Sequence, residues 1–118
     1  MGADVLNCYN AGAIRCTANY GGGITGDIGG GKIYNSYNTG KVSGDSKLGG
    51  ICGFNSGQII NCYNIGDING TTEVGGIAGT NMNGTIKNNY STGTITGTSA
   101  YIGSVQVVNI KLGQAQHI

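Results

Sequence analysis

The sequence predicts an all-β fold, a right-handed parallel β-helix (β-solenoid) with about four coils of 26–28 residues and three short strands in each coil. The first observation is the motif Asn-Cys-Tyr-Asn-x-Gly, which occurs at residues 7–12 and 61–66 and returns, slightly altered, at 35–40 and 88–93. Its tyrosines, Tyr9, Tyr37, Tyr63 and Tyr90, are 28, 26 and 27 residues apart. The second observation is a Gly-Gly-Ile-x-Gly block that recurs with the same period as this motif. A fixed period of this length is typical of stacked repeats, in which each unit covers its neighbour's apolar face.

The strands are predicted from short apolar runs that Gly, Asn or Ser bound on each side. In the third repeat these runs cover residues 58–64, 66–69 and 73–78. Runs of this length between turn formers predict strands, and dense glycine disfavours a helix by about 1 kcal/mol per residue. We expect one domain, residues 1–118, with coils at roughly 5–31, 32–57, 58–84 and 85–106 and a degenerate C-terminal cap at 107–118. Residues 107–111 are expected to echo residues 59–63.

Columns of equivalent residues follow from this alignment. The aliphatic columns are predicted to face inward: Ile33, Ile59 and Ile86; Val42, Ile68 and Ile95; Ile24, Ile51 and Ile77. The first asparagine of each motif (Asn7, Asn35, Asn61 and Asn88) is expected to form a ladder of side-chain amides. The tyrosine column has two interpretations. Strict alternation from Ile59 places the tyrosines inside, whereas a bend at Asn61 places the Cys/Ser/Asn column inside and stacks the tyrosines outside.

Composition argues against several classes of function. Only 9% of the residues are charged and the net charge is +1, so we expect no nucleic-acid partner. No apolar run approaches the roughly 20 residues that span a bilayer, so we expect no membrane insertion. The four cysteines form no Cys-x-x-Cys pair, and we expect mostly free thiols that serve as small fillers, and no metal or cofactor site. The carboxylates fall at unrelated repeat phases, which predicts that the chain is not an enzyme.

The combined pattern Gly-Gly-Ile-x-Gly-x-Asn and Ile-x-Asn-Cys-Tyr-Asn-x-Gly-x-Ile-x-Gly resembles the GLUG-motif repeats of bacterial surface and secreted proteins. The resemblance extends over roughly residues 5–103. Such repeats occur in adhesin-like proteins and in the non-catalytic part of immunoglobulin A-cleaving metallopeptidases. The peptidase signature His-Glu-x-x-His is absent, so the resemblance implies no protease activity. It implies an extracellular or cell-surface location, although no signal peptide opens this chain.

We therefore expect a non-enzymatic structural or adhesive repeat module. The alternative is a subunit that stacks end to end into an extracellular filament, because the strand Asp4, Val5, Leu6 and Asn7 begins without a visible cap. A glycan-processing enzyme is a third and weaker alternative. The expected partners are the chain itself, by coil-end stacking, or neighbouring repeats of a longer chain. A host or glycan ligand is a further candidate that no motif identifies.

Overall fold

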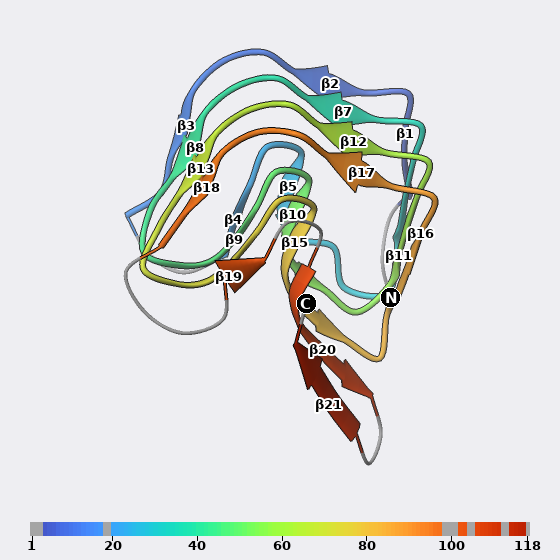
Figure 1. Cartoon of the computed structure of the whole chain (residues 1–118). Coiled ribbons are helices and arrows are strands. Elements are labelled where there is room, and N and C mark those ends of the chain that lie inside the picture. The colour runs from blue at the N-terminus through green and yellow to red at the C-terminus, as the bar shows by residue number, and fades with distance from the viewer. Residues whose placement is uncertain (1–3, 18–19, 98–101, 104–105, 112–113, 118) are drawn as a thin grey trace.

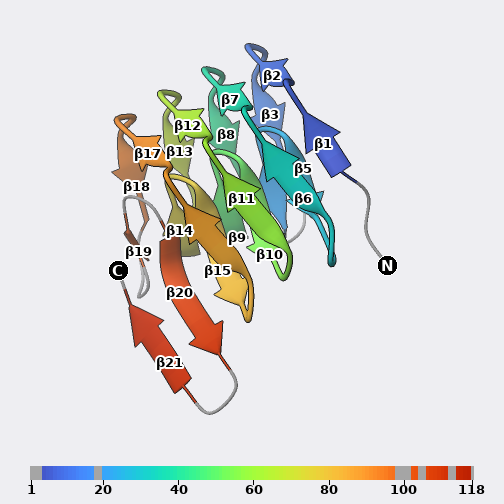
Figure 2. The ribbon, with the colours of Figure 1, turned by 90° about the vertical axis from the view of Figure 1, so that its right-hand side faces the viewer.

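The computed structural model describes residues 4–17, 20–97, 102–103, 106–111 and 114–117, which form a parallel β-solenoid of about three turns (Figure 1). The described residues form strands and no helix. In each turn the chain passes through five sheets in a constant order, here named A to E. Strands of successive turns lie side by side along the solenoid axis (Figure 2). The all-β class and the parallel solenoid expected from the sequence are confirmed.

The sheets have the following strands. Sheet A contains β1 (Asp4–Leu6), β6 (Lys32–Tyr34), β11 (Gln58–Ile60) and β16 (Thr85–Lys87). Sheet B contains β2 (Tyr9–Asn10), β7 (Tyr37–Asn38), β12 (Tyr63–Asn64) and β17 (Tyr90–Ser91). Sheet C contains β3 (Ile14–Arg15), β8 (Val42–Ser43), β13 (Ile68–Asn69) and β18 (Ile95–Thr96). Sheet D contains β4 (Gly21–Gly22), β9 (Ser46–Gly49), β14 (Thr72–Gly75) and β19 (Ile102–Gly103). Sheet E contains β5 (Thr25–Asp27), β10 (Cys52–Asn55), β15 (Ala78–Met82), β20 (Gln106–Lys111) and β21 (Gln114–His117).

The number of strands in each turn corrects the sequence prediction of three. The predicted run 58–64 is two strands, β11 and β12, because Asn61 between them adopts a left-handed φ of 57°. The predicted run 73–78 is also two strands, β14 and β15, because the chain reverses at Gly76 and Ile77. A left-handed residue or a reversal ends an extended strand, so the five sheets come from three apolar runs.

The reversal between sheets D and E divides the core in two. Figure 1 shows β4 and β9, and then β5, β10 and β15, inside the arc formed by sheets A, B and C. One cluster includes Ile33, Ile51 and Ile59, and a second includes Val42 and Ile68. All five are fully buried, as their sequence columns predict, and each such side chain contributes roughly 1.5–3 kcal/mol. The repeat therefore contains two separate apolar clusters.

The corner before sheet B decides between the two interpretations of the tyrosine column. Asn7, Asn35, Asn61 and Asn88 all have positive φ, between 53° and 58°. The bend turns Ser36 and Cys62 into the core and the tyrosines onto the outer surface. The four asparagines are exposed, and they serve as left-handed corners, a conformation that Asn tolerates. The prediction that they form an amide ladder is wrong.

This corner supports a first prediction. Asn61→Ala should lower the free energy of unfolding by about 1 kcal/mol, because a Cβ-bearing residue other than Asn is penalised in the left-handed region. Asn61→Gly should leave stability nearly unchanged, since glycine adopts positive φ freely. Urea unfolding followed by circular dichroism measures both. Asn69→Ala is the matched control, because Asn69 is exposed and lies in strand β13. Equal losses for Asn61→Ala and Asn61→Gly would contradict the conformational explanation.

The C-terminal segment pairs differently from the prediction. Strand β20 continues sheet E in parallel with β15, with Val108 opposite Thr80 and Asn109 opposite Asn81. Residues 107–111 therefore align mainly with the part of β15 that follows the Gly-Gly-Ile block, and the expected echo of residues 59–63 is wrong. Strand β21 then folds back antiparallel on the outer edge of β20. Of the predicted cap, residues 112–113 and 118 lie outside the described residues.

Candidate functional site

The tyrosine stack, defined as Tyr9, Tyr37, Tyr63 and Tyr90, is the most regular surface feature. Successive ring centroids lie 5.2, 4.9 and 5.1 Å apart, and the interplanar angles are 8° or less. Each inner ring therefore has both faces against a neighbour, and mainly edges and hydroxyl groups face outward. Desolvation, followed by the adjacent Tyr37 and Tyr90, raises the pKa of Tyr63. The flanks of this stack present no ring face to a lateral ligand; open faces occur only at its two ends.

The second asparagine of the motif, and not the first, forms the asparagine ladder, defined as Asn10, Asn38, Asn64 and Ser91. Asn10 Nδ2 donates to Asn38 Oδ1 (2.9 Å), and Asn38 Nδ2 donates to Asn64 Oδ1 (2.8 Å). Asn64 Nδ2 donates to Ser91 Oγ (3.1 Å). Asn64 also bonds the backbone N–H and C=O of Gly66. Sequence reasoning missed this ladder; its signal was the Asn-x-Gly spacing, which allows an Asn side chain to bond the backbone two residues on.

The Cys/Ser column lies beneath the tyrosine stack. Ser36 and Cys62 are 1% exposed, whereas Cys8 is exposed. All four cysteines are free, as expected. Burial raises the pKa of Cys62, and it raises that of Cys52 from 9.0 to about 12. A neutral buried thiol is a small apolar filler and a poor nucleophile, so the structure gives Cys52 and Cys62 no catalytic character.

The buried Cys52 thiol makes stability depend on alkaline pH. The pKa of this thiol is higher in the folded protein than in the unfolded chain. Its contribution to the free energy of unfolding is therefore fully present below pH 9 and is lost as the pH rises from 9 to about 12. Within that window we expect a loss of about 1.4 kcal/mol per pH unit from this group. Thermal unfolding of Cys52→Ala and of the parent chain at several pH values isolates this contribution. Ala78 fills the same column in the next turn, so alanine fits there. Parallel pH profiles for the two proteins would refute this prediction.

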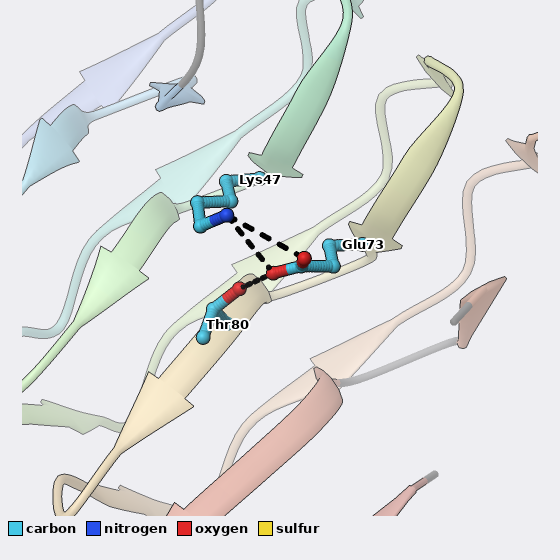
Figure 3. Close-up of polar contacts among 3 residues, drawn as sticks. All are labelled: Lys47, Glu73 and Thr80. Atoms are coloured by element: carbon cyan, nitrogen blue, oxygen red, sulfur yellow. Dashed lines mark hydrogen bonds and ion pairs between the residues drawn. The ribbon is translucent and has the colours of Figure 1, made fainter. Parts of the chain in front are cut away.

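The charged cluster of Lys47, Glu73 and Thr80 joins sheets D and E (Figure 3). Lys47 Nζ lies 3.4 Å from both Glu73 carboxylate oxygens, and the Thr80 hydroxyl donates to Glu73. Lys47 Nζ also lies 5.9 Å from the ring centre of Tyr20. The side chains of Lys47 and Glu73 are 24% and 23% exposed, so solvent weakens the pair.

The backbone of this cluster is strained. Tyr20, Lys47 and Glu73 occupy equivalent positions with φ of 67°, 56° and 53°, although none is Gly or Asn. Such strain costs about 1–3 kcal/mol for each residue. The carboxylate of Glu73 is held by Lys47 on one neighbouring strand and by Thr80 on another, so its side chain links three strands.

The other predicted candidates lie apart from this cluster. Strand β1 is an edge of sheet A, with Val5 half-buried and Leu6 exposed. Ile51 and Ile77 are fully buried at the D–E reversal, and Ile24 is partly buried. Within the part of the chain that the structure describes, no three His, Cys, Asp or Glu side chains gather in a metal-binding arrangement. No helix able to cross a bilayer occurs among those residues.

In-register parallel strands and columns of like side chains define the class of this protein, a parallel β-solenoid repeat protein. Within this class, residues 44–69 and 70–96 match the family described as the GLUG motif. The chain therefore contains two GLUG repeats, and the family recognised from the sequence is confirmed. Each match contains one strand from each of the five sheets, β9 to β13 and β14 to β18. No curated protein and no solved structure matches the chain.

Proposed function

We propose that this chain is a non-enzymatic structural or adhesive module of a bacterial surface or secreted protein. One observation carries the proposal: the residues that recur in every turn are used in stacking the turns. The tyrosines contact each other, the asparagines bond each other, and the glycines allow close backbone approach. A repeat with this design builds a stiff rod whose length depends on the number of turns. We also propose that the chain forms four coils. We propose right-handed winding, because connections between parallel strands are almost always right-handed.

An adhesive role would use the residues that vary between turns. Arg15, Tyr34, Lys41 and Phe54 occupy columns whose members differ in charge and size. Arg15 and Lys41 are exposed, and Tyr34 and Phe54 are half-buried. These side chains can change without disturbing the stack, so we expect binding specificity to depend on them. A host or glycan ligand remains the candidate partner for these positions, and an extracellular location is part of the proposal.

The experiment is a combined binding and turnover screen. The purified chain is incubated with host matrix proteins and a polysaccharide panel, and both bound chain and cleavage products are measured. We expect no cleavage product, and we expect any binding to fall at least fivefold in Arg15→Ala or Lys41→Ala. Asn69→Ala serves as the exposed control. Catalytic turnover that Glu73→Gln abolishes would replace this proposal with the glycan-processing alternative.

A second candidate is a subunit that assembles end to end. The observation that favours it is that the aliphatic side chains of sheet A are less buried at the two ends of their column than in its middle. Ile33 and Ile59 are fully buried, whereas Val5 and Ile86, at the ends of the same column, are only partly buried. Analytical ultracentrifugation over a wide concentration range tests this candidate. A single monomeric species at the highest concentrations would count against it.

A further inference from the structure

The two end faces of the described stack are complementary in strand pairing. Sheets A, B and C each end in a strand of the first turn, β1, β2 or β3, and at the other end in β16, β17 or β18. All pairings inside these sheets are parallel and in register. One more parallel strand can therefore be added at either end with the same geometry.

The asparagine ladder has a direction that continues across the ends. Every amide in it donates toward the C-terminal turn, from Asn10 to Asn38 and on to Ser91. At one end, Ser91 Oγ accepts a bond and its hydroxyl hydrogen can donate to another acceptor. At the other end, Asn10 Oδ1 accepts only the Gly12 N–H at 3.3 Å among the bonds described. An amide oxygen has two lone pairs, so Asn10 can accept a second bond from a Ser91 hydroxyl.

The tyrosine stack ends in open ring faces on the same two surfaces. Tyr9 is 65% exposed and Tyr90 is 54% exposed, whereas Tyr37 and Tyr63 are partly buried. The spacing inside the stack is about 5 Å, close to the separation of paired strands. A strand pair formed between β17 and β2 would therefore place Tyr90 against Tyr9 at the spacing of the existing stack.

We propose that a second copy of this chain docks its β16–β18 face on the β1–β3 face of the first, in the register that the sheets already use. A second copy fits this face because its own end face repeats the contacts that already join successive turns. In this register Ile86 covers Val5, Tyr90 stacks on Tyr9, Ser91 bonds Asn10 and Ile95 covers Ile14. The inference rests on the proposed role as a stacking module and identifies the partner of its ends. The contact is head to tail and does not close on itself, so it generates open filaments.

Strand β21 competes with this docking. In the second copy it lies antiparallel on the outer edge of β20, where β5 of the first copy would pair. Among the described strands, sheet E is therefore covered at the end where sheets A, B and C have no further strand. Docking of a full turn requires β21 to leave that edge, so weakening β21 should strengthen the assembly.

The test is a disulfide between copies. Register places residue 89 of one copy opposite Cys8 of the next, at the ~4.8 Å strand spacing that suits a disulfide. The variant is Asn89→Cys with Cys62→Ser, because Cys62 is adjacent to position 89 within one chain and Ser36 shows that serine fits this column. Ala115→Pro with Gln116→Pro is added to weaken β21. Only alternate residues of an antiparallel strand donate a backbone hydrogen bond to the partner, so one of two adjacent prolines must remove such a bond. The control is Thr92→Cys with Cys62→Ser, in which the new thiol is exposed on the flank.

The full chains are oxidised mildly and separated on a non-reducing gel. We expect a concentration-dependent ladder of covalent oligomers for the Asn89→Cys variant, at least fivefold above the control and stronger when the two prolines are present. Circular dichroism verifies that each variant retains its β structure. A gel identical to that of the control, from folded protein at the highest concentration, would overturn the docking. Equal ladders with and without the prolines would overturn the role of β21. Either result leaves the single-chain scaffold role in place, because that role needs no second copy.

Discussion

Asn64→Ala should lower the free energy of unfolding by about 3–5 kcal/mol, the largest effect that we expect from a polar substitution. Asn64 is fully buried and makes four described hydrogen bonds, two along the ladder and two to the backbone of Gly66. Alanine would leave an Asn38 N–H and the Gly66 N–H without these acceptors, and each buried unpaired group costs about 1–3 kcal/mol. Stabilities of natural domains are only about 5–15 kcal/mol, so the variant should be close to unfolding. Urea unfolding measures the difference.

Asn64→Ser is the matched comparison. Ser91 occupies the same column in the next turn, so a hydroxyl fits there and can accept the bond from Asn38. We expect the serine variant to recover at least 1 kcal/mol of the loss in the alanine variant. Asn69→Ala, on the exposed side of β13, should change stability by less than about 0.5 kcal/mol. If Asn64→Ala proved as mild as Asn69→Ala, the ladder would have no energetic importance.

Gly50→Ala should be at least as damaging, because the turn between sheets D and E passes directly against the asparagine ladder. A Cβ at Gly50 would lie 2.3 Å from Asn64 Cγ and 2.3 Å from the Gly76 carbonyl oxygen. The asparagine is fixed by its bonds and the oxygen is backbone, so neither can move away cheaply. Overpacking in a core typically costs 1–3 kcal/mol, and we expect at least 3 kcal/mol here because two rigid contacts are violated. The readout is the urea midpoint, or the yield of folded protein if the variant does not fold.

Gly30→Ala is the control for this substitution. A Cβ at Gly30 meets no heavy atom within 4 Å, and its φ is not positive. We expect a change in stability within about 0.5 kcal/mol. A Gly50→Ala protein as stable as Gly30→Ala would mean that the reversal between sheets D and E does not approach Asn64 as described. Comparison of the two variants separates local crowding from the general effect of replacing a glycine.

Both large effects involve positions whose importance the sequence signalled only in part. The recurrence of the Gly-Gly-Ile block indicated the repeat but not the reversal that it forms, and the Asn-x-Gly spacing was visible in three turns. Neither pattern shows that Gly50 and Asn64 meet, because Gly50 lies in the reversal between β9 and β10 and Asn64 lies in β12, and they touch only when that reversal enters the arc of sheets A to C. The strained cluster at Lys47 and Glu73 was likewise hidden. Their left-handed backbone is set by the surrounding turns and contradicts the usual preference for Gly or Asn.

The repeat period by itself determined the class of fold, the parallel stacking and the aliphatic columns Ile33–Ile59 and Val42–Ile68, because apolar residues at equivalent places in successive turns can be buried together only if the turns stack. Tertiary structure alone decided the five sheets, the divided core and the asparagine that forms the ladder. The physical reason is that the extended and the left-handed backbone conformations of a single residue differ little in free energy. Asn61 can continue a strand or adopt the left-handed corner at a difference of about 1 kcal/mol. Burial of Cys62 and the stacking of Tyr63, which depend on neighbouring turns, decide between them.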